Sequence, residues 1–370
     1  MRRPLVLLSA GLVLAVPFAL GYELSGRSGT GAVSVVERVR EELAGRYYRQ
    51  VPARVLQLGS VGAILSALGD PYTAYLPPND YRLLRDETAS HYSGIGATVL
   101  PSAVGLVVVA VPSGPAERAG IRVGDTIVGI GGTPARQLGL ADALARILGP
   151  RGTRVQLEVM RGRVPLDLTV ERDVVRAPVV HARLLSYAGG RWGVVRLSAF
   201  RFGAAQLLGK QIQTLVQEGA QGFVLDLRGN PGGVLDQAVA VASLFLDQGV
   251  IVSLAGAHHP HRVYRAAPGL TTRLPLVVLV DRYSASAAEI VTAALRDNHR
   301  ATIVGERTYG KALVQSLDPL GDGGALELTV ARYYTPAGDD ISGVGVAPDV
   351  YASDGEAVPI ALRILAHPLS

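Results

Sequence analysis

Cysteine is absent from this 370-residue chain. Its absence excludes disulfide bonds, cysteine-based metal sites, thiol nucleophiles and a lipid-modified cysteine near the N-terminus. Lysine is almost absent as well, since the chain has two lysines, Lys210 and Lys311, against 34 arginines. No long basic run and no alternation of basic with aromatic residues occurs, so the net charge of +5 does not indicate a nucleic-acid partner.

The scarcity of lysine has two explanations. A bias in nucleotide composition would replace most lysines by arginines and leave the last two at arbitrary positions. The other explanation is chemical, because arginine stays protonated in proteins whereas a buried lysine can lose its proton and act as a base. Composition does not decide between the two, so the neighbours of Lys311 must.

Residues 1–21 are predicted to be a signal peptide or a membrane anchor. Two early arginines followed by an apolar run over residues 5–20 are typical of a secretory signal. The run is slightly short for a transmembrane helix and slightly long for a minimal signal, so cleavage and membrane association both stay open. Either way we expect export to an extracytoplasmic site, the periplasm or cell envelope, with residues 22–32 as a flexible linker.

The rest of the chain divides into regions by the spacing of its apolar residues and glycines. Its length allows two or three domains. Apolar residues at helical spacing predict an N-terminal helical region over 33–90. Short strands separated by glycines predict a small, mainly β domain over 91–173. Strands alternate with helices over 174–355, with strands expected at 192–197, 222–227, 250–254, 275–280, 301–305 and 325–334, and helices at 204–218, 234–246 and 284–295. This alternation predicts a layered α/β domain with buried strands, and 356–370 form a C-terminal tail.

Two predicted strands of the α/β region end in unusual sequences, "VLDLRGNPGG" (224–233) and "VVLVDRYSASAAEI" (277–290). Sites in α/β sheets collect beyond the carboxyl ends of strands, so these loops are candidates. The glycines of the first loop leave backbone N–H groups free to face a ligand. The second loop places Ser284 and Ser286 at the start of a helix predicted over 284–295, where the partial positive charge stabilises an oxyanion.

Ser286 has a structural and a catalytic interpretation. With Glu289 it forms the capping-box pattern S-x-x-E, and spacing alone favours that structural role. A nucleophilic serine needs a base, and none of the seven histidines lies in a recognisable triad motif. Lys210 is most simply a solvated helix residue. Lys311 follows a buried strand in a glycine-flanked turn, where burial would lower its pKa toward the neutral amine.

The segments "YSASAAEI" (283–290) and "GERTYGKALVQ" (305–315) resemble the C-terminal processing peptidases, or tail-specific proteases, which are PDZ-containing serine proteases with a Ser–Lys dyad. The resemblance implies roles for five residues: nucleophile Ser286, general base Lys311, lysine-orienting Gln315, and an oxyanion hole from the backbone N–H groups of Gly232 and Ala287. The chain departs from the family's usual Asn, Gly and Ser at Asp281, Tyr283 and Ala288. None of these departures removes a dyad member.

The resemblance covers roughly residues 33 to 352, through further motifs such as "SGPAERAGIRVGDTIVGIGG", "DLRGNPGG" and "YYTPAGDDISGVGVAPDV". It implies an α/β protease core of the layered ββα, crotonase-like type, with an inserted mainly-β PDZ domain and an N-terminal helical segment. The PDZ domain would bind a substrate tail as an added strand. Its terminal carboxylate would meet the backbone N–H groups of Tyr92, Ser93, Gly94, Ile95 and Gly96.

The implied function is that of an exported serine endopeptidase, which cleaves protein tails or unfolded proteins through an acyl-enzyme. Its partners would be polypeptides with apolar C-termini, and neither a metal nor an organic cofactor is needed. A catalytically latent or inactive PDZ scaffold that binds tails is the alternative. A lyase of the enoyl-CoA hydratase type shares the layered fold but needs neither a PDZ insert nor the dyad. Assembly as a homo-oligomer stays open.

Overall fold

The computed structural model describes residues 34–88, 92–138, 140–175, 179–267, 269 and 271–367. The predicted signal or anchor and the linker lie outside these residues. Among the described helices, none combines the length and the hydropathy that a membrane crossing needs. The chain forms two compact units, one up to Leu84 and from Val179 onward, the other from Arg85 to Pro178.

A six-stranded mixed sheet lies at the centre of the first unit. Its first pair is antiparallel and every later pair is parallel. The strands follow the order β10 (Val180–Tyr187), β11 (Gly190–Leu197), β12 (Gly222–Asp226), β15 (Leu276–Val280), β16 (Thr302–Gly305) and β19 (Val350–Tyr351). Strands β12 and β15 are buried at every position, as parallel strands covered on both faces must be.

A second, five-stranded antiparallel sheet belongs to the same unit. It runs in the order β1 (Ala74–Leu76), β18 (Ala325–Tyr334), β13 (Val250–Gly256) and β14 (His259–Arg265), and β17 (Leu313–Pro319) also pairs with β18. The sequence predicted β13 and β18 but missed β1, β14 and β17. Strand β14 is "HPHRVYR", a mostly exposed edge strand without an apolar run, which leaves no periodic signal.

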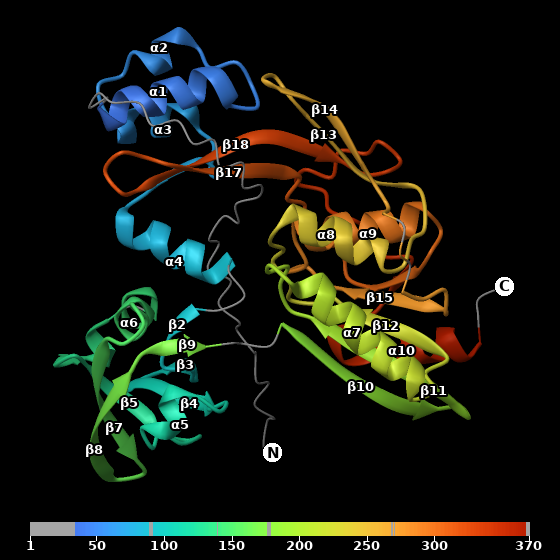
Figure 1. The fold of residues 1–370 in the computed structure, drawn as a ribbon, viewed down its shortest axis with the longest axis horizontal. Helices are drawn as coiled ribbons and strands as arrows, with labels where there is room; N and C mark the ends of the chain where they lie inside the picture. Colours follow the sequence, from blue (N-terminus) through green and yellow to red (C-terminus); the bar gives the residue numbers. More distant parts are fainter. Residues whose placement is uncertain are drawn as a thin grey trace, which may run out of the picture. The chain divides into compact units, whose positions relative to one another are not determined.

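Helices separate and cover these sheets. α7 (Ala204–Gln217), α8 (Leu235–Ser243) and α9 (Ala287–Asp297) share one hydrophobic core with both sheets, and Figure 1 shows α8 and α9 between β18 and β15. α10 (Asp354–Ala366) packs on the other face of the mixed sheet. The N-terminal helices pack on the first core: α1 (Val35–Arg46), α2 (Ala53–Leu56) and α3 (Val61–Leu68).

Helix α9 starts later than the sequence predicted. The pattern placed its start at Ser284, whereas the helix begins at Ala287 with Ser286 as its N-cap. Ser284 belongs instead to the preceding loop, because its hydroxyl donates to the carbonyl oxygen of Leu227 at 2.9 Å. Ser286 has φ 54° and ψ −114°, which no helical residue adopts, so the backbone turns sharply before the helix.

The second unit is mainly β and has its own core, which includes the buried Ile95, Val108 and Ile127. Its main sheet contains β3 (Thr98–Ser102), β4 (Gly105–Ala110), β5 (Thr126–Ile130), β7 (Arg154–Arg161) and β8 (Val164–Glu171), in that order, with β6 (Thr133–Pro134) on β5. β2 (Tyr92–Gly94) pairs separately with β9 (Asp173–Val175). The helices are α4 (Pro78–Thr88), which begins in the first unit, α5 (Pro115–Arg118), the 3₁₀ helix η1 (Ala135–Gln137) and α6 (Leu140–Ile147).

We expect Gly305→Ala to destabilise the first unit by at least about 2 kcal/mol. Gly305 ends β16 with φ 133°, and an added Cβ would overlap the carbonyl oxygen of Val280 on β15. Gly62→Ala is the matched control, because Gly62 is exposed on α3 with open space around it, and we expect it to change stability by less than about 1 kcal/mol. Denaturant unfolding measures both, and equal stabilities would contradict the prediction.

Candidate active site

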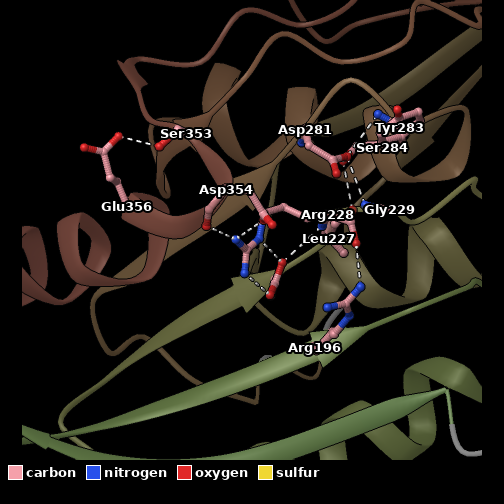
Figure 2. Close-up of polar contacts among 11 residues, drawn as sticks. Arg196, Leu227, Arg228, Gly229, Asp281, Tyr283, Ser284, Ser353, Asp354 and Glu356 are labelled. Carbon is pink, nitrogen blue, oxygen red and sulfur yellow. Dashed lines mark hydrogen bonds and ion pairs between the residues drawn. The ribbon is translucent and has the colours of Figure 1, made fainter. Parts of the chain in front are cut away.

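The loop after β12 is fastened by Arg228. Its guanidinium donates two hydrogen bonds to the Asp226 carboxylate, from Nε at 2.8 Å and from Nη2 at 2.7 Å. A third bond, at 2.6 Å, reaches Asp354 at the start of α10 (Figure 2). The bidentate pair between Arg228 and Asp226 fixes the direction in which the chain leaves β12.

The loops after β12 and β15 are also tied to each other. Asp281 Oδ1 accepts the N–H groups of Gly229 at 2.9 Å and Tyr283 at 3.0 Å. The Ser284 hydroxyl joins the same pair of loops through Leu227, as Figure 2 shows. The two candidate segments of the sequence therefore form one structure at the end of the mixed sheet.

Gly232 lies directly against the start of α9. A Cβ at this position would be 2.9 Å from Ser286 Cβ and 3.0 Å from the Ala287 nitrogen, so only glycine fits without displacement. The two residues predicted for the oxyanion hole are thus neighbours. The Gly232 N–H, however, donates to Asn230 Oδ1 at 2.9 Å. Its role in an oxyanion hole stays a prediction.

Ser286 is fully buried, and its Oγ has no hydrogen-bond partner among the described residues. Its backbone N–H donates to Glu289 Oε2 at 2.8 Å, so the carboxylate side of the predicted capping box is formed. A positive φ is strained for a serine, and such strain often accompanies a functional turn. The hydroxyl is therefore held at a helix N-terminus without a competing acceptor.

Glu289 does more than cap its helix. Its Oε1 accepts from the Thr308 hydroxyl at 2.6 Å and the Gly310 N–H at 2.7 Å, and its Oε2 accepts from Lys311 N–H at 2.9 Å as well as from Ser286. Burial raises the pKa of Glu289, and these four donors oppose that rise. The sequence revealed only the local S-x-x-E pattern, because the other donors lie about twenty residues away.

Lys311 is buried beside the Glu289 carboxylate, and 7% of its surface is exposed. Burial lowers the pKa of its amine to about 8, and the carboxylates of Glu327, Asp70 and Glu289 oppose the decrease. Its Nζ lies 5.0 Å from the centroid of the Tyr72 ring. The backbone N–H groups of Lys311 and Ser286 bind the same carboxylate, but the Lys311 amine and the Ser286 hydroxyl are not hydrogen-bonded to each other.

Gln315 lies on β17, fully buried, and does not contact the lysine amine through a hydrogen bond. Its Nε2 lies 3.5 Å from Thr329 Oγ1 on β18, and its Oε1 has no partner among the described residues. The predicted lysine-orienting role of Gln315 is therefore still a prediction. Lys210 is exposed on α7, as expected of a solvated helix residue. Among the described residues, no three His, Asp or Glu side chains are placed to hold a metal ion.

The predicted tail-binding segment lies in the second unit. Tyr92, Ser93 and Gly94 form β2 and pair with β9. Ile95 is 1% exposed within the core of the unit, and its carbonyl oxygen accepts the Ala116 N–H at 2.7 Å. Gly96 follows with φ 74° and leads into β3. Binding of a terminal carboxylate by this segment stays a prediction.

We expect Glu289→Gln to lower the free energy of unfolding by about 2 kcal/mol or more, because the new amide would face two backbone or hydroxyl donors without accepting from them. Glu306→Gln is the control, since Glu306 is partly exposed and pairs with the exposed Arg282, and we expect its loss to change stability by about 1 kcal/mol or less. Denaturant unfolding measures the stability of both variants. A smaller loss of stability in Glu289→Gln than in Glu306→Gln would refute the interpretation that Glu289 holds these segments together.

Family models match two parts of the chain. The model of peptidase family S41 matches residues 191–352, within the first unit. The model of the PDZ domain matches residues 106–161, within the second unit. These matches agree with the two motif groups from which the sequence analysis predicted the protease core and the PDZ insert.

Named relatives extend the match over most of the chain. A carboxyl-terminal-processing protease of Picosynechococcus sp. is 41% identical over 295 residues, which are 78% of this chain and 71% of the relative. One from Synechocystis sp. is 38% identical over 296 residues, 78% of this chain and 69% of the relative. The solved photosystem II D1 C-terminal processing protease is 31% identical with a TM-score of 0.59, over 90% of this chain and 97% of that one.

These similarities confirm the resemblance, the fold class and the enzymatic activity that the sequence predicted. The family match favours a peptidase over the lyase, which needs no PDZ domain. The chain therefore belongs to the carboxyl-terminal processing proteases of peptidase family S41, which are serine-type peptidases, and it carries a PDZ domain.

Proposed function

We propose that this serine-type peptidase cleaves polypeptides with a Ser–Lys dyad, in which Ser286 is the nucleophile and Lys311 the general base. One observation carries the proposal: a single carboxylate, Glu289, binds the backbone N–H groups of both residues. The lowered pKa of Lys311 supports it, because a base must be neutral to accept a proton. Burial of both residues keeps competing water away.

The reaction would proceed in two halves. The neutral Lys311 amine takes the hydroxyl proton as Ser286 Oγ attacks the scissile carbonyl carbon, and the resulting ammonium returns that proton to the leaving amine. Water then hydrolyses the acyl-enzyme. The N–H groups of Gly232 and Ala287 would stabilise the oxyanion, each contributing on the order of 3 kcal/mol.

The described arrangement is then a resting one. The dyad closes only when the Lys311 side chain turns toward the unpartnered Ser286 hydroxyl. Gly232 joins the oxyanion hole only when its N–H leaves Asn230. Gln315, whose Oε1 is free of donors, is proposed to accept from the amine once the lysine has turned.

The PDZ domain would select the substrate by its tail. An extended tail with an apolar C-terminus would add as a strand, and backbone N–H groups of residues 92–96 would meet its carboxylate.

We further propose that the protein acts outside the cytoplasm, secreted or anchored through residues 5–20, because of the signal-like sequence there. A latent scaffold that only binds tails is the second candidate, favoured by the open dyad.

Lys311→Arg is expected to lower kcat/KM at least about 100-fold, because arginine keeps the positive charge but cannot accept the serine proton. The assay uses the full chain and an unfolded protein that ends in apolar residues. Ser286→Ala gives the background rate, and Lys210→Arg is the matched control at the chain's other lysine. Cleavage retained by Lys311→Arg would refute the dyad. Failure of a serine-reactive probe to label the wild-type enzyme would instead favour the scaffold.

Activity is expected to rise with pH through a midpoint near 8, the value to which burial lowers the pKa of Lys311. The sign follows from the base role: below the midpoint the amine is protonated and inactive, and above it the amine is neutral. A pH profile of kcat/KM tests this. A steady fall in activity over the same range would exclude a lysine base.

A further inference from the structure

A buried carboxylate that the proposed mechanism does not use lies on β18. Glu327 is fully buried, and neither of its carboxylate oxygens has a hydrogen-bond partner among the described residues. Burying a carboxylate without donors is costly, since nothing replaces its lost hydration. Such a group calls for a positively charged partner.

Glu327 is near a second buried acceptor without a partner. Thr329 stands two residues further along β18, and therefore on the same face, directly opposite Gln315 of β17. Gln315 Oε1 also lacks a partner among the described residues. Three buried acceptor oxygens thus gather on one face of two paired strands, with no donor bound to any of them.

Three carboxylates favour the ammonium form of Lys311, those of Glu327, Asp70 and Glu289. The sheet places Glu327 on the lysine's side, because Glu327 pairs with Ala74 of β1, two residues beyond Tyr72, whose ring centroid lies 5.0 Å from Lys311 Nζ. The other two are already supplied with donors. Glu289 accepts four hydrogen bonds. Asp70 accepts from the Tyr72 N–H at 2.9 Å, the Thr73 hydroxyl at 2.7 Å and the Tyr47 hydroxyl at 3.2 Å. Of the three, Glu327 alone accepts no hydrogen bond from the described residues, so both of its oxygens can accept from an ammonium group.

Rotation of the Lys311 side chain alone can turn its amine from Glu327 toward Ser286. Its N–H is bound by Glu289, and its carbonyl oxygen accepts the Tyr333 hydroxyl at 2.6 Å, so the backbone is fixed on both sides. Its Nζ rests over the ring of Tyr72, which favours the charged ammonium. Rotation about the side-chain bonds is the remaining freedom.

We infer that Glu327 is the buried counter-ion of Lys311, a positioning residue that stabilises the ammonium form and thereby sets the pH above which the lysine can serve Ser286. The inference rests on the proposed Ser–Lys function. In the paired form the carboxylate balances the ammonium. When the pair releases one proton, the neutral amine is free to turn and accept the proton of the Ser286 hydroxyl.

The protonation of the two groups is coupled in the expected sense. Burial raises the pKa of Glu327, and the Lys311 ammonium opposes this rise. Burial lowers the pKa of Lys311, and the Glu327 carboxylate opposes that decrease, so the charged forms of the two groups stabilise each other. Removing the Glu327 charge would leave the burial of Lys311 in place but remove a charge that opposes its effect, so the pKa of Lys311 should fall further.

The near-absence of lysine makes this directly measurable. In the full chain labelled with ¹³C-lysine, the two Cε signals belong to Lys311 and to the exposed Lys210, which serves as an internal reference. In Glu327→Gln we expect the NMR titration midpoint of Lys311 to fall by about one pH unit, and the midpoint of kcat/KM to fall with it. The Lys210 signal should titrate as in the wild type.

Two variants control the charge and the fold. Glu327→Asp keeps a carboxylate and should keep the Lys311 midpoint close to the wild type. Glu218→Gln removes an exposed carboxylate at the end of α7 and should shift nothing. Thermal unfolding checks each fold, and Glu327→Met replaces Glu327→Gln if that variant does not fold.

A Lys311 midpoint that is unchanged or higher in Glu327→Gln overturns the counter-ion inference, even if Lys311→Arg is inactive and the dyad stands. Cleavage by Lys311→Arg overturns the dyad whatever the NMR titration gives. The spectroscopic measurement does not depend on turnover, so the two failures are distinguishable.

Discussion

The Glu289 carboxylate holds the site together. Its four donors come from the start of α9 and from the loop that follows β16, two segments brought side by side by the parallel pairing of β15 and β16. An acceptor-only group fits this environment, because four donors offset much of the cost of removing the carboxylate from water. The strained turn at Ser286 and the placement of Lys311 both depend on it.

Around Lys311, burial and charge act in opposite directions. Burial favours the neutral amine, while three carboxylates favour the ammonium, and the outcome is a pKa lowered to about 8. The carboxylates differ in what they already bind, since Glu289 and Asp70 have donors and Glu327 has none. An arginine here would stay charged under every condition, so the proposed base role requires a lysine at this position of an arginine-rich chain.

The sequence predicted the parts of the fold that repeat a simple pattern. Apolar runs indicated β12 and β15, and helical spacing indicated α1, α3 and α7. Patterns failed where tertiary contacts decide the local structure. Strand β14 is an exposed edge with no alternation, and α9 starts three residues late because Ser284 bonds to a loop across the sheet edge.

The sequence alone established the family, from ordered motifs, and made Ser286 and Lys311 candidates, a serine at a helix start and a lysine in an arginine-rich chain, whose catalytic roles the resemblance implies. The tertiary structure decided how these residues are held and which charges surround them. Glu289 joins segments about twenty residues apart, and Glu327 lies sixteen residues beyond Lys311 on a different strand. Burial and hydrogen bonding, which set the protonation of a side chain, exist only once the strands have paired.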